Sequence, residues 1–181
     1  MAPESIAFVR ELLPYRDCAG IALFNREGKV FVGRRRLKDD AENSALHGAP
    51  WQMPQGGIDK GEEPLDAARR ELLEETSVTS IKLLAEAPDW IIYDLPDDLL
   101  GKSWKGKYRG QRQRWFAFLF TGKDSEIDVI EPGNGKFHAE FADWRWADLT
   151  ETPDLIVDFK RGAYREIVAA FANIPAKIRR G

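Results

Sequence analysis

The sequence predicts an α+β fold, in which helices flank a mixed β-sheet. Segments with the apolar character of strands fall into two groups along the chain, and each group is followed by one helical segment, an order typical of helices packed on a sheet. The length of 181 residues suits one domain, and 43% hydrophobic residues provide for a substantial core. We therefore expect a single domain spanning residues 1–181.

The first group of elements precedes a long polar segment. Residues 4–13 have the pattern of a short N-terminal helix. Two buried strands follow, at residues 18–25 and 29–34, and the turn between them ends at Gly28, as is common in β-hairpins. Residues 37–50 are mostly polar and show no period, which indicates a loop.

The central helix is predicted over residues 64–76. Pro64 suits the first helical turn, and Glu62 and Glu63 lie at the positive end of the helix dipole. Strands are then predicted at residues 81–84, 90–95, 115–120 and 141–146, and a last amphipathic helix at residues 159–173.

Charge and cysteine content limit the classes of function. The net charge of −3 gives no global basic excess, so a polyanionic ligand would have to be bound by local cations and metal. The single cysteine, Cys18, cannot form an intrachain disulfide, which fits a reducing compartment. The N-terminus lacks a signal-peptide pattern, and no apolar run is long enough to cross a membrane. We expect a cytoplasmic monomer without a membrane partner, and the sequence predicts no protein partner.

The central helix carries an acidic face. At about 100° per residue, Glu71, Glu74 and Glu75 fall within one arc of the helix surface, and Leu72 falls on another. Carboxylates gathered in this way repel one another, and a bound cation would cancel the repulsion. Hard oxygen ligands without His or Cys favour magnesium or manganese over zinc. Three glutamates alone would also fit an ordinary solvated helix face.

The residues before the helix favour the metal site over the solvated face. Gly56, Gly57 and Gly61 let the backbone approach a ligand closely and adopt positive φ. Arg70 adjoins the acidic face and can pair with Glu62, which would fix this loop against the helix. A glycine-rich loop that leads into an acidic helix suits a metal-bound polyphosphate.

These residues resemble the signature of the Nudix hydrolases. That signature is matched by Gly56, Glu62, Arg70, Glu71, Leu72, Glu74, Glu75 and Val78. One position departs from it, because Ser77 stands where the family has a glycine that ends the helix. The departure affects helix termination and no metal ligand.

The resemblance implies a fold, a reaction and roles for residues. The fold would be a Nudix-type α/β/α sandwich around a mixed sheet. The reaction would be attack of water on a phosphorus of a nucleoside diphosphate derivative, with Mg²⁺ or Mn²⁺, and more than one ion, as cofactor. Metal ligands and catalytic groups would be Glu71, Glu74 and Glu75, assisted by the Gly56 carbonyl, with Glu62 and Arg70 as structural partners.

Other stretches narrow the resemblance to two related groups. Residues 51–55, 90–96, 110–116, 140–146 and 157–161 look like those of bacterial RNA pyrophosphohydrolases and dinucleoside polyphosphate hydrolases, such as diadenosine tetraphosphate hydrolases. The likeness extends from about Tyr15 to Phe171. It implies that Glu140 is a further metal ligand or the general base.

The same likeness implies how substrate is held. Arg35 and Lys160 match phosphate-contacting positions, and Arg16, Val157 and Phe159 match positions that hold a nucleobase. Ordinary core packing is almost as good an interpretation of Val157 and Phe159. The loop at residues 37–50 is longer than in well-known members, and Pro50 replaces a phosphate-binding serine, so contacts on that side stay open.

A basic run with interleaved aromatics occupies residues 102–114. It could steer RNA or be solvated surface. Gln111, Arg112 and Arg114 lie near the start of a predicted strand and are favoured for phosphate contact.

The sequence therefore predicts an acid-anhydride hydrolase of 5′-triphosphate RNA ends, of diadenosine polyphosphates, or of both. A nucleoside triphosphate sanitising hydrolase is a second interpretation, and an inactive nucleotide-binding sensor a third from another class. The four retained glutamates of the signature argue against the sensor. The metal count, the general base and the oligomeric state stay open.

Overall fold

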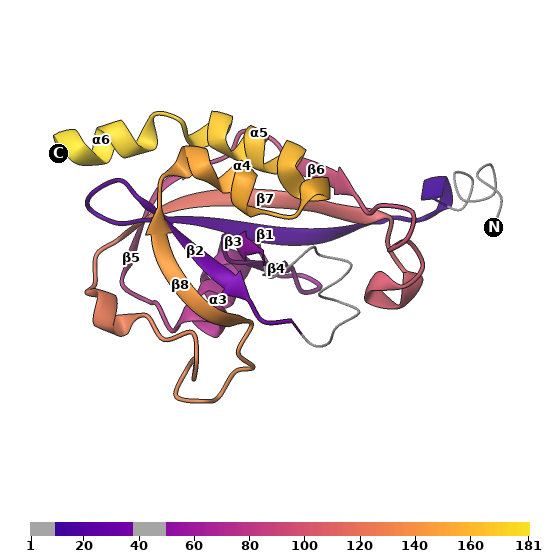
Figure 1. The fold of residues 1–181 in the computed structure, drawn as a ribbon, viewed down its shortest axis with the longest axis horizontal. Coiled ribbons are helices and arrows are strands. Elements are labelled where there is room, and N and C mark those ends of the chain that lie inside the picture. Colours follow the sequence, from indigo (N-terminus) through magenta and orange to yellow (C-terminus); the bar gives the residue numbers. More distant parts are fainter. Residues whose placement is uncertain (1–9, 38–49) are drawn as a thin grey trace.

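The computed structural model describes residues 10–37 and 50–181. Within them, the strands form one sheet in the order β3-β2-β1-β7-β5, and β4 pairs with β1, β6 with β7 and β8 with β2 (Figure 1). The strands are β1 (Tyr15–Phe24), β2 (Val30–Arg35), β3 (Trp51–Gln52), β4 (Gln55–Gly57), β5 (Ile81–Glu86), β6 (Ile91–Asp94), β7 (Gly110–Phe120) and β8 (Phe141–Ala147).

The sheet is mixed, because β1 and β7 pair in parallel while the other pairs are antiparallel. The parallel register extends from Tyr15 opposite Gly110 to Phe24 opposite Leu119. Parallel strands are covered on both faces in most proteins. Here, however, the two strands extend beyond helix α3 (Pro64–Thr76), which covers one of their faces (Figure 1).

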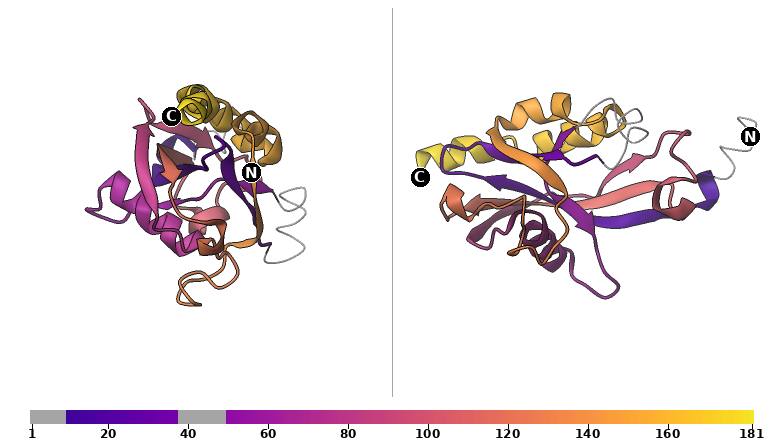
Figure 2. Two further views of the ribbon diagram at one scale, coloured as in Figure 1. Left: turned by 90° about the vertical axis from the view of Figure 1, so that its left-hand side faces the viewer. Right: turned by 60° about the horizontal axis from the view of Figure 1, so that its bottom comes forward.

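Helices cover both faces of the sheet, as the α/β/α prediction requires (Figures 1 and 2). Helix α3 packs Ala67, Ala68 and Leu72 on one face, in a cluster with Phe116 and Phe118 of β7. The other face is covered by α4 (Thr152–Leu155) and α5 (Arg161–Phe171), followed by α6 (Ile174–Arg180). Short 3₁₀ turns lie at Ser103–Gly106 (η1), Asp124–Glu126 (η2), Leu149–Glu151 (η3) and Asp158–Lys160 (η4).

Several predicted elements are confirmed. The central helix has the predicted bounds, and the turn between β1 and β2 closes with a hydrogen bond from the Gly28 N–H to the Asn25 carbonyl at 3.0 Å. Gly28 adopts a φ of 74°, which a glycine tolerates without strain. No helix among the described residues is long and apolar enough to cross a membrane.

Two predictions about element bounds need correction. β7 begins at Gly110, five residues before the predicted start, because its first half carries buried glutamines and charged arginines instead of an apolar run. The last helix, expected over residues 159–173, begins after a 3₁₀ turn and ends at Phe171. It is followed by α6, which has Pro175 in its first turn.

Two predictions concern residues outside the described part of the chain. Of the N-terminal helix expected at residues 4–13, the structure describes only residues 10–13, and residues 10–12 are helical. Of the loop expected at residues 37–50, residues 38–49 lie outside the described ranges.

Candidate active site

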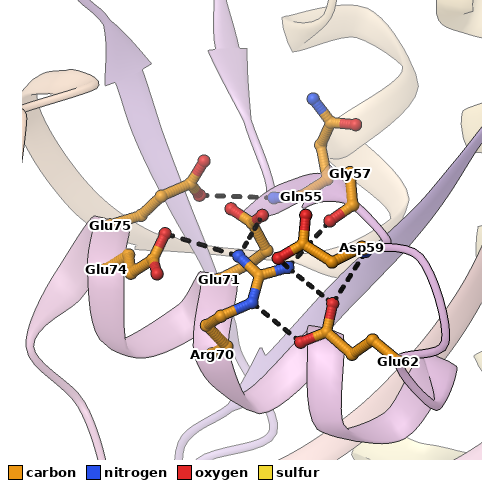
Figure 3. Close-up of polar contacts among 8 residues, drawn as sticks. All are labelled: Gln55, Gly57, Asp59, Glu62, Arg70, Glu71, Glu74 and Glu75. Carbon is orange, nitrogen blue, oxygen red and sulfur yellow. Dashed lines mark hydrogen bonds and ion pairs between the residues drawn. The ribbon is translucent and has the colours of Figure 1, made fainter.

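Helix α3 presents its acidic side toward the loop that precedes it (Figure 3). Its apolar side is fully buried on the sheet, which fixes the rotation of the helix and therefore the direction of Glu71, Glu74 and Glu75. Glu75 is buried, and its carboxylate accepts a hydrogen bond from the Gln55 N–H at 3.3 Å. The helix thus brings three carboxylates to one wall of a cavity.

Arg70 ties the loop to the helix (Figure 3). Its Nε and Nη2 each donate to a Glu62 carboxylate oxygen at 2.8 Å. Nη2 also donates to the Gly57 carbonyl, and Nη1 to Glu71, both at 2.8 Å. The pairing of Arg70 with Glu62 that the sequence predicted is therefore present, and the same guanidinium also reaches the acidic face.

Burial and charge shift the pKa values of these carboxyl groups in opposite directions. Hydrogen bonds from Arg70 lower the pKa of Glu62 to about 2. Burial raises the pKa of Glu75 well above its usual value, and the neighbouring carboxylates of Glu71 and Glu140 raise it further. Burial also raises the pKa of Glu71. The carboxylates around Glu75 create a negative field at its side chain that a cation would relieve.

The glycines of the loop are required by close contacts. A Cβ on Gly56 would lie 2.1 Å from the carboxyl carbon of Glu71, so any side chain there would displace this carboxylate. A Cβ on Gly57 would lie 2.5 Å from Nη2 of Arg16. The loop thus leaves room for one acidic and one basic side chain from other elements.

A cavity of about 950 Å³ joins this wall to residues distant in the sequence. Of the predicted residues, it is lined by Arg16, Arg35, Gly56, Glu71, Glu74, Glu75, Gln111, Glu140, Val157, Phe159 and Lys160. The segments come from β1, β2, β4, α3, β7, the residue before β8, and η4. The structure therefore places nearly all of the predicted site residues around one space.

Two of the residues predicted to contact phosphate do not line this cavity. Arg112 pairs with Asp17 at 2.5 Å, and Arg114 pairs with Glu86. Both guanidinium groups lie over the ring of Trp90, 4.8 and 5.7 Å from its centroid. They project from the opposite face of β7 to Gln111, because successive side chains of a strand alternate. The predicted phosphate contact of Arg112 and Arg114 thus lacks support from this cavity.

The cavity also contains residues that the sequence did not single out. Tyr93 lies 5.8 Å from Phe159 between ring centroids, and its buried hydroxyl has no hydrogen-bond partner among the described residues. Trp104 lines the same space, with Arg16 5.7 Å from its ring centroid. His138 also lines it. The sequence signal for Tyr93 and Trp104 was only their aromatic character within stretches already noted.

Lys160 is the most buried cation of the cavity, with 9% of its surface exposed. Burial lowers the pKa of Lys160 to about 8, and the positive charge of Arg35 contributes to the shift. Its Nζ lies 5.2 Å from the ring centroid of Tyr93. A charge held this deep is costly without an anion, so the position favours an anionic ligand.

A sequence model described as the NUDIX domain matches residues 14–169. This chain belongs to the Nudix family. Its Nudix signature forms the loop from Gly56, helix α3, and the turn after the helix. Ser77, the one departure, adopts the left-handed conformation with a φ of 66°, as the family glycine would. Its hydroxyl accepts a hydrogen bond from the Gly133 N–H at 2.9 Å, a contact that glycine could not make.

Curated relatives match this Nudix chain over nearly its whole length. An RNA pyrophosphohydrolase of Mesorhizobium japonicum is 56% identical over 172 residues, covering 95% of this chain and 98% of the relative. An RNA pyrophosphohydrolase of Rhizobium meliloti is 56% identical over 166 residues, covering 91% and 97%.

Solved structures share the fold at low sequence identity. The E. coli dihydroneopterin triphosphate pyrophosphohydrolase superposes with a TM-score of 0.60 at 18% identity, covering 86% of this chain and 98% of that chain. A C. elegans Ap4A hydrolase complex has a TM-score of 0.58 at 17% identity, covering 87% and 98%. These likenesses confirm the Nudix fold.

Divalent metal is typical of Nudix hydrolases, and the groups present suit such an ion. The donors are carboxylate and carbonyl oxygens, which hard divalent cations prefer. Among the described residues, no three acidic, His or Cys side chains already converge closely enough to hold an ion. Arg70 instead contacts both Glu71 and Glu74. An ion bound at this Nudix site would therefore share these two carboxylates with Arg70 or draw them away from it.

Proposed function

We propose that this protein is a divalent-metal-dependent RNA pyrophosphohydrolase, which removes pyrophosphate from the 5′-triphosphate end of RNA. The observation that carries the proposal is the single cavity that joins the acidic face of α3 to buried cations and aromatic walls. The two relatives described above as RNA pyrophosphohydrolases support it, because their identity to this chain extends over nearly all of both sequences.

The metal site would consist of the carboxylates of Glu71, Glu74 and Glu75 with the Gly56 carbonyl. Mg²⁺ or Mn²⁺ bound there, as more than one ion, would neutralise phosphate charge and supply a water of lowered pKa. Glu140 is the residue before β8. It lines the same cavity, and its charge raises the pKa of Glu75. It would serve as a further ligand or as the general base.

The remaining cavity residues would hold the substrate. Arg35 and Lys160 would neutralise the phosphates, and the buried position of Lys160 makes its charge available only within the cavity. Phe159, packed near Tyr93, and Val157 would contact a base, together with Arg16 beside Trp104. Gln111 offers an amide at the floor of the same cavity.

Dinucleoside polyphosphate hydrolysis is a second candidate. Aromatic side chains line the cavity in two places, Trp104 on the segment before β7 and Phe159 on η4. Two stacking positions would suit a ligand with a nucleoside at each end of its polyphosphate. A sanitising hydrolase of free nucleoside triphosphates has no such feature in its favour.

Glu75→Gln tests the metal-dependent reaction. The amide keeps the shape of the side chain and loses its charge, so we expect a fall in kcat of at least about 100-fold with Mg²⁺. Glu166→Gln, which removes an exposed carboxylate from α5, is the matched control and should retain parental activity. An active Glu75→Gln variant would rule out this metal site. A parent protein that binds nucleotide without hydrolysing it would favour the sensor.

Parallel kinetics on triphosphorylated RNA and diadenosine tetraphosphate test the substrate. A preference of about 100-fold in kcat/KM corresponds to about 2.7 kcal/mol of transition-state discrimination and would identify the substrate. Pyrophosphate and 5′-monophosphate RNA are the products expected from RNA. Inactivity on both substrates would contradict the proposed function and leave the family membership intact.

A further inference from the structure

A second hollow of about 680 Å³ adjoins the candidate active site on the α3 side of the sheet. It shares Arg16, Gly57 and Glu71 with the main cavity, so the two spaces meet at the proposed metal site. The partition between them includes Trp104 and Tyr108, whose rings meet edge to face with centroids 6.3 Å apart. A chain molecule held in the main cavity could therefore continue directly into the second hollow.

The second hollow is lined by aromatic and charged side chains. Tyr15 and Tyr108 provide ring surfaces, and Lys60 and Arg112 provide positive charge. The acidic members are Asp17 and Asp59, together with the shared Glu71. This combination of rings and cations resembles neither an apolar cleft nor a plain salt-bridged surface.

Trp90 extends this surface along β7. Its half-buried ring contacts the guanidinium groups of Arg112 and Arg114, which lie 4.8 and 5.7 Å from the ring centroid. Ile92, opposite Arg112 in the register of β6 and β7, leaves 46% of its surface exposed beside them. We call the surface formed by Tyr15, Lys60, Trp90, Tyr108, Arg112 and Arg114 the lateral strip.

The pattern of β7 shows that the lateral strip is distinct from core-covering surface. Phe116 and Phe118 occupy the same face of β7 as Arg112 and Arg114, and they are buried under α3. Beyond the end of that cover, the same face changes from phenylalanine to arginine. Any polar side chain would suit a sheet face that is open to water. Two arginines beside an aromatic ring additionally allow stacking and cation–π contacts.

The arginines of the lateral strip are already ion-paired. Arg112 donates two hydrogen bonds to the Asp17 carboxylate, and both side chains are more than 40% exposed. Arg114, whose side chain is 18% exposed, pairs with the exposed Glu86. The carboxylate of each pair is accessible to solvent, and a guanidinium with five donors retains free donors beside one carboxylate. A phosphate can therefore join or replace these carboxylates.

We propose that the lateral strip binds the RNA chain downstream of its triphosphate end. The inference rests on the proposed function. Single-stranded RNA presents the two features that such a surface recognises, since bases stack on the accessible parts of aromatic rings and on guanidinium planes, and phosphates pair with cations between them. Diadenosine polyphosphates have no phosphodiester chain to extend along the strip, so the strip would favour RNA over diadenosine polyphosphates.

The test compares triphosphorylated RNAs of two and of twelve unpaired nucleotides. For the parent, KM should be lower for the longer RNA. Trp90→Ala and the double variant Arg112→Gln/Arg114→Gln should each raise KM for the longer RNA about five- to tenfold. The kcat for both RNAs, and KM for the RNA of two nucleotides, should stay at the parental values. The double variant should also lower the slope of log KM against log salt by about 1.4, because each of the two phosphate contacts on a single strand contributes about 0.7.

Two further variants separate binding from loss of structure. Asp17→Asn/Glu86→Gln removes the carboxylates that compete with phosphate, and should lower KM for the longer RNA. Lys177→Gln/Arg180→Gln removes two exposed positive charges from α6, which lies beyond the other end of the sheet (Figure 1), and should change neither KM. A structural defect would not make the arginine double variant raise KM and the carboxylate double variant lower it.

Equal KM values for the two RNA lengths, or equal effects of Trp90→Ala on both, would overturn the lateral strip. Binding can be measured without catalysis by fluorescence anisotropy, using a twelve-nucleotide RNA that carries a 5′-hydroxyl. This measurement distinguishes failure of the lateral strip from failure of the proposed function. If the parent cleaves no RNA, a Kd that Trp90→Ala weakens about fivefold would still support the strip. Absence of binding, or binding that Trp90→Ala leaves unchanged, would reject it.

Discussion

Lys160 links the depth of the cavity to a measurable pH dependence. Burial lowers the pKa of Lys160 to about 8. The side chain is therefore charged below this pH in the free enzyme and loses its charge as the pH rises through it. If Lys160 binds phosphate, kcat/KM of the parent should fall above about pH 8, since kcat/KM reports ionisation of the free enzyme.

Lys160→Arg provides the comparison, because arginine stays charged throughout this range. Its kcat/KM on triphosphorylated RNA, measured from pH 6.5 to 9.5, should lack the Lys160-dependent fall above pH 8. Ionisation of metal-bound water would appear in both proteins and cancels in the ratio. A ratio of the two profiles that does not change with pH would exclude Lys160 as the titrating group.

Ser77 combines backbone strain with a useful side chain. Its φ of 66° costs a non-glycine residue about 1 kcal/mol. Its hydroxyl accepts from the Gly133 N–H and donates to the Asp128 carbonyl. Ser77→Ala keeps the strain and loses both contacts, so it should destabilise by about 1–2 kcal/mol. Ser77→Gly relieves the strain as it loses the contacts, and should lie near the parent. Urea unfolding measures both, and an alanine variant as stable as the glycine variant would contradict this account.

At the scale of elements, Arg70 joins helix α3 to the loop before it. Arg70→Lys keeps the charge but loses the fork that contacts Glu62, Gly57 and Glu71 together. We expect a loss of about 1–3 kcal/mol in stability and lower activity, measured by urea unfolding and by turnover of triphosphorylated RNA. Arg69→Lys is the control, because that neighbour is exposed and, within residues 10–37 and 50–181, pairs with Asp66 alone.

The stability difference between the parent and Arg70→Lys should depend on pH. The folded pKa of Glu62, about 2, lies below its ordinary value because Arg70 donates to the carboxylate. A carboxyl group with a lowered pKa stabilises the fold above its unfolded pKa of about 4.3, and this contribution is lost as the pH falls toward 2. The difference should therefore narrow between about pH 4 and pH 2. A constant difference over this range would indicate that Arg70 acts through contacts other than Glu62.

The elements that sequence predicted best are those with local signals. Pro64 and the acidic first turn mark the start of α3, and its bounds are the predicted ones. The start of β7 carries no such signal, because Gln111 and Gln113 face a polar cavity and hydrogen-bond each other there. An apolar alternation test therefore misses this half of the strand.

The candidate site shows the same division. The glutamates of the Nudix signature follow from spacing on one helix, while Tyr93 and Trp104 join the cavity only through the pairing of β6 and the course of the 95–109 segment. Their contribution depends on tertiary neighbours that no local pattern encodes. Arg112 and Arg114 are close to Gln111 in the sequence yet lie outside the cavity, because side chains of a strand alternate between its two faces.

At the scale of the whole molecule, the fold and the proposed metal site are held by different forces. Two hydrophobic clusters, one on each face of the sheet, contain the large buried side chains. The acidic site lies at the margin of these clusters and adds carboxylate repulsion rather than apolar contact. The fold should therefore persist without metal, although the acidic site lowers its stability.

Removal and return of Mg²⁺ tests this separation. Protein treated with EDTA should unfold cooperatively on heating yet lack hydrolytic activity. Mg²⁺ at about 100 times its Kd stabilises by about 2.7 kcal/mol, which corresponds to a rise of about 5–10 °C in Tm for a domain of this size. Glu75→Gln should lose most of that rise, whereas Glu166→Gln should keep it, and NaCl at matched ionic strength should not reproduce it. An equal rise in the Tm of Glu75→Gln would place the stabilising ion elsewhere. An ion bound at the proposed site stabilises the fold by relieving the repulsion of Glu75 by Glu71 and Glu140, and this repulsion is absent when residue 75 is a glutamine.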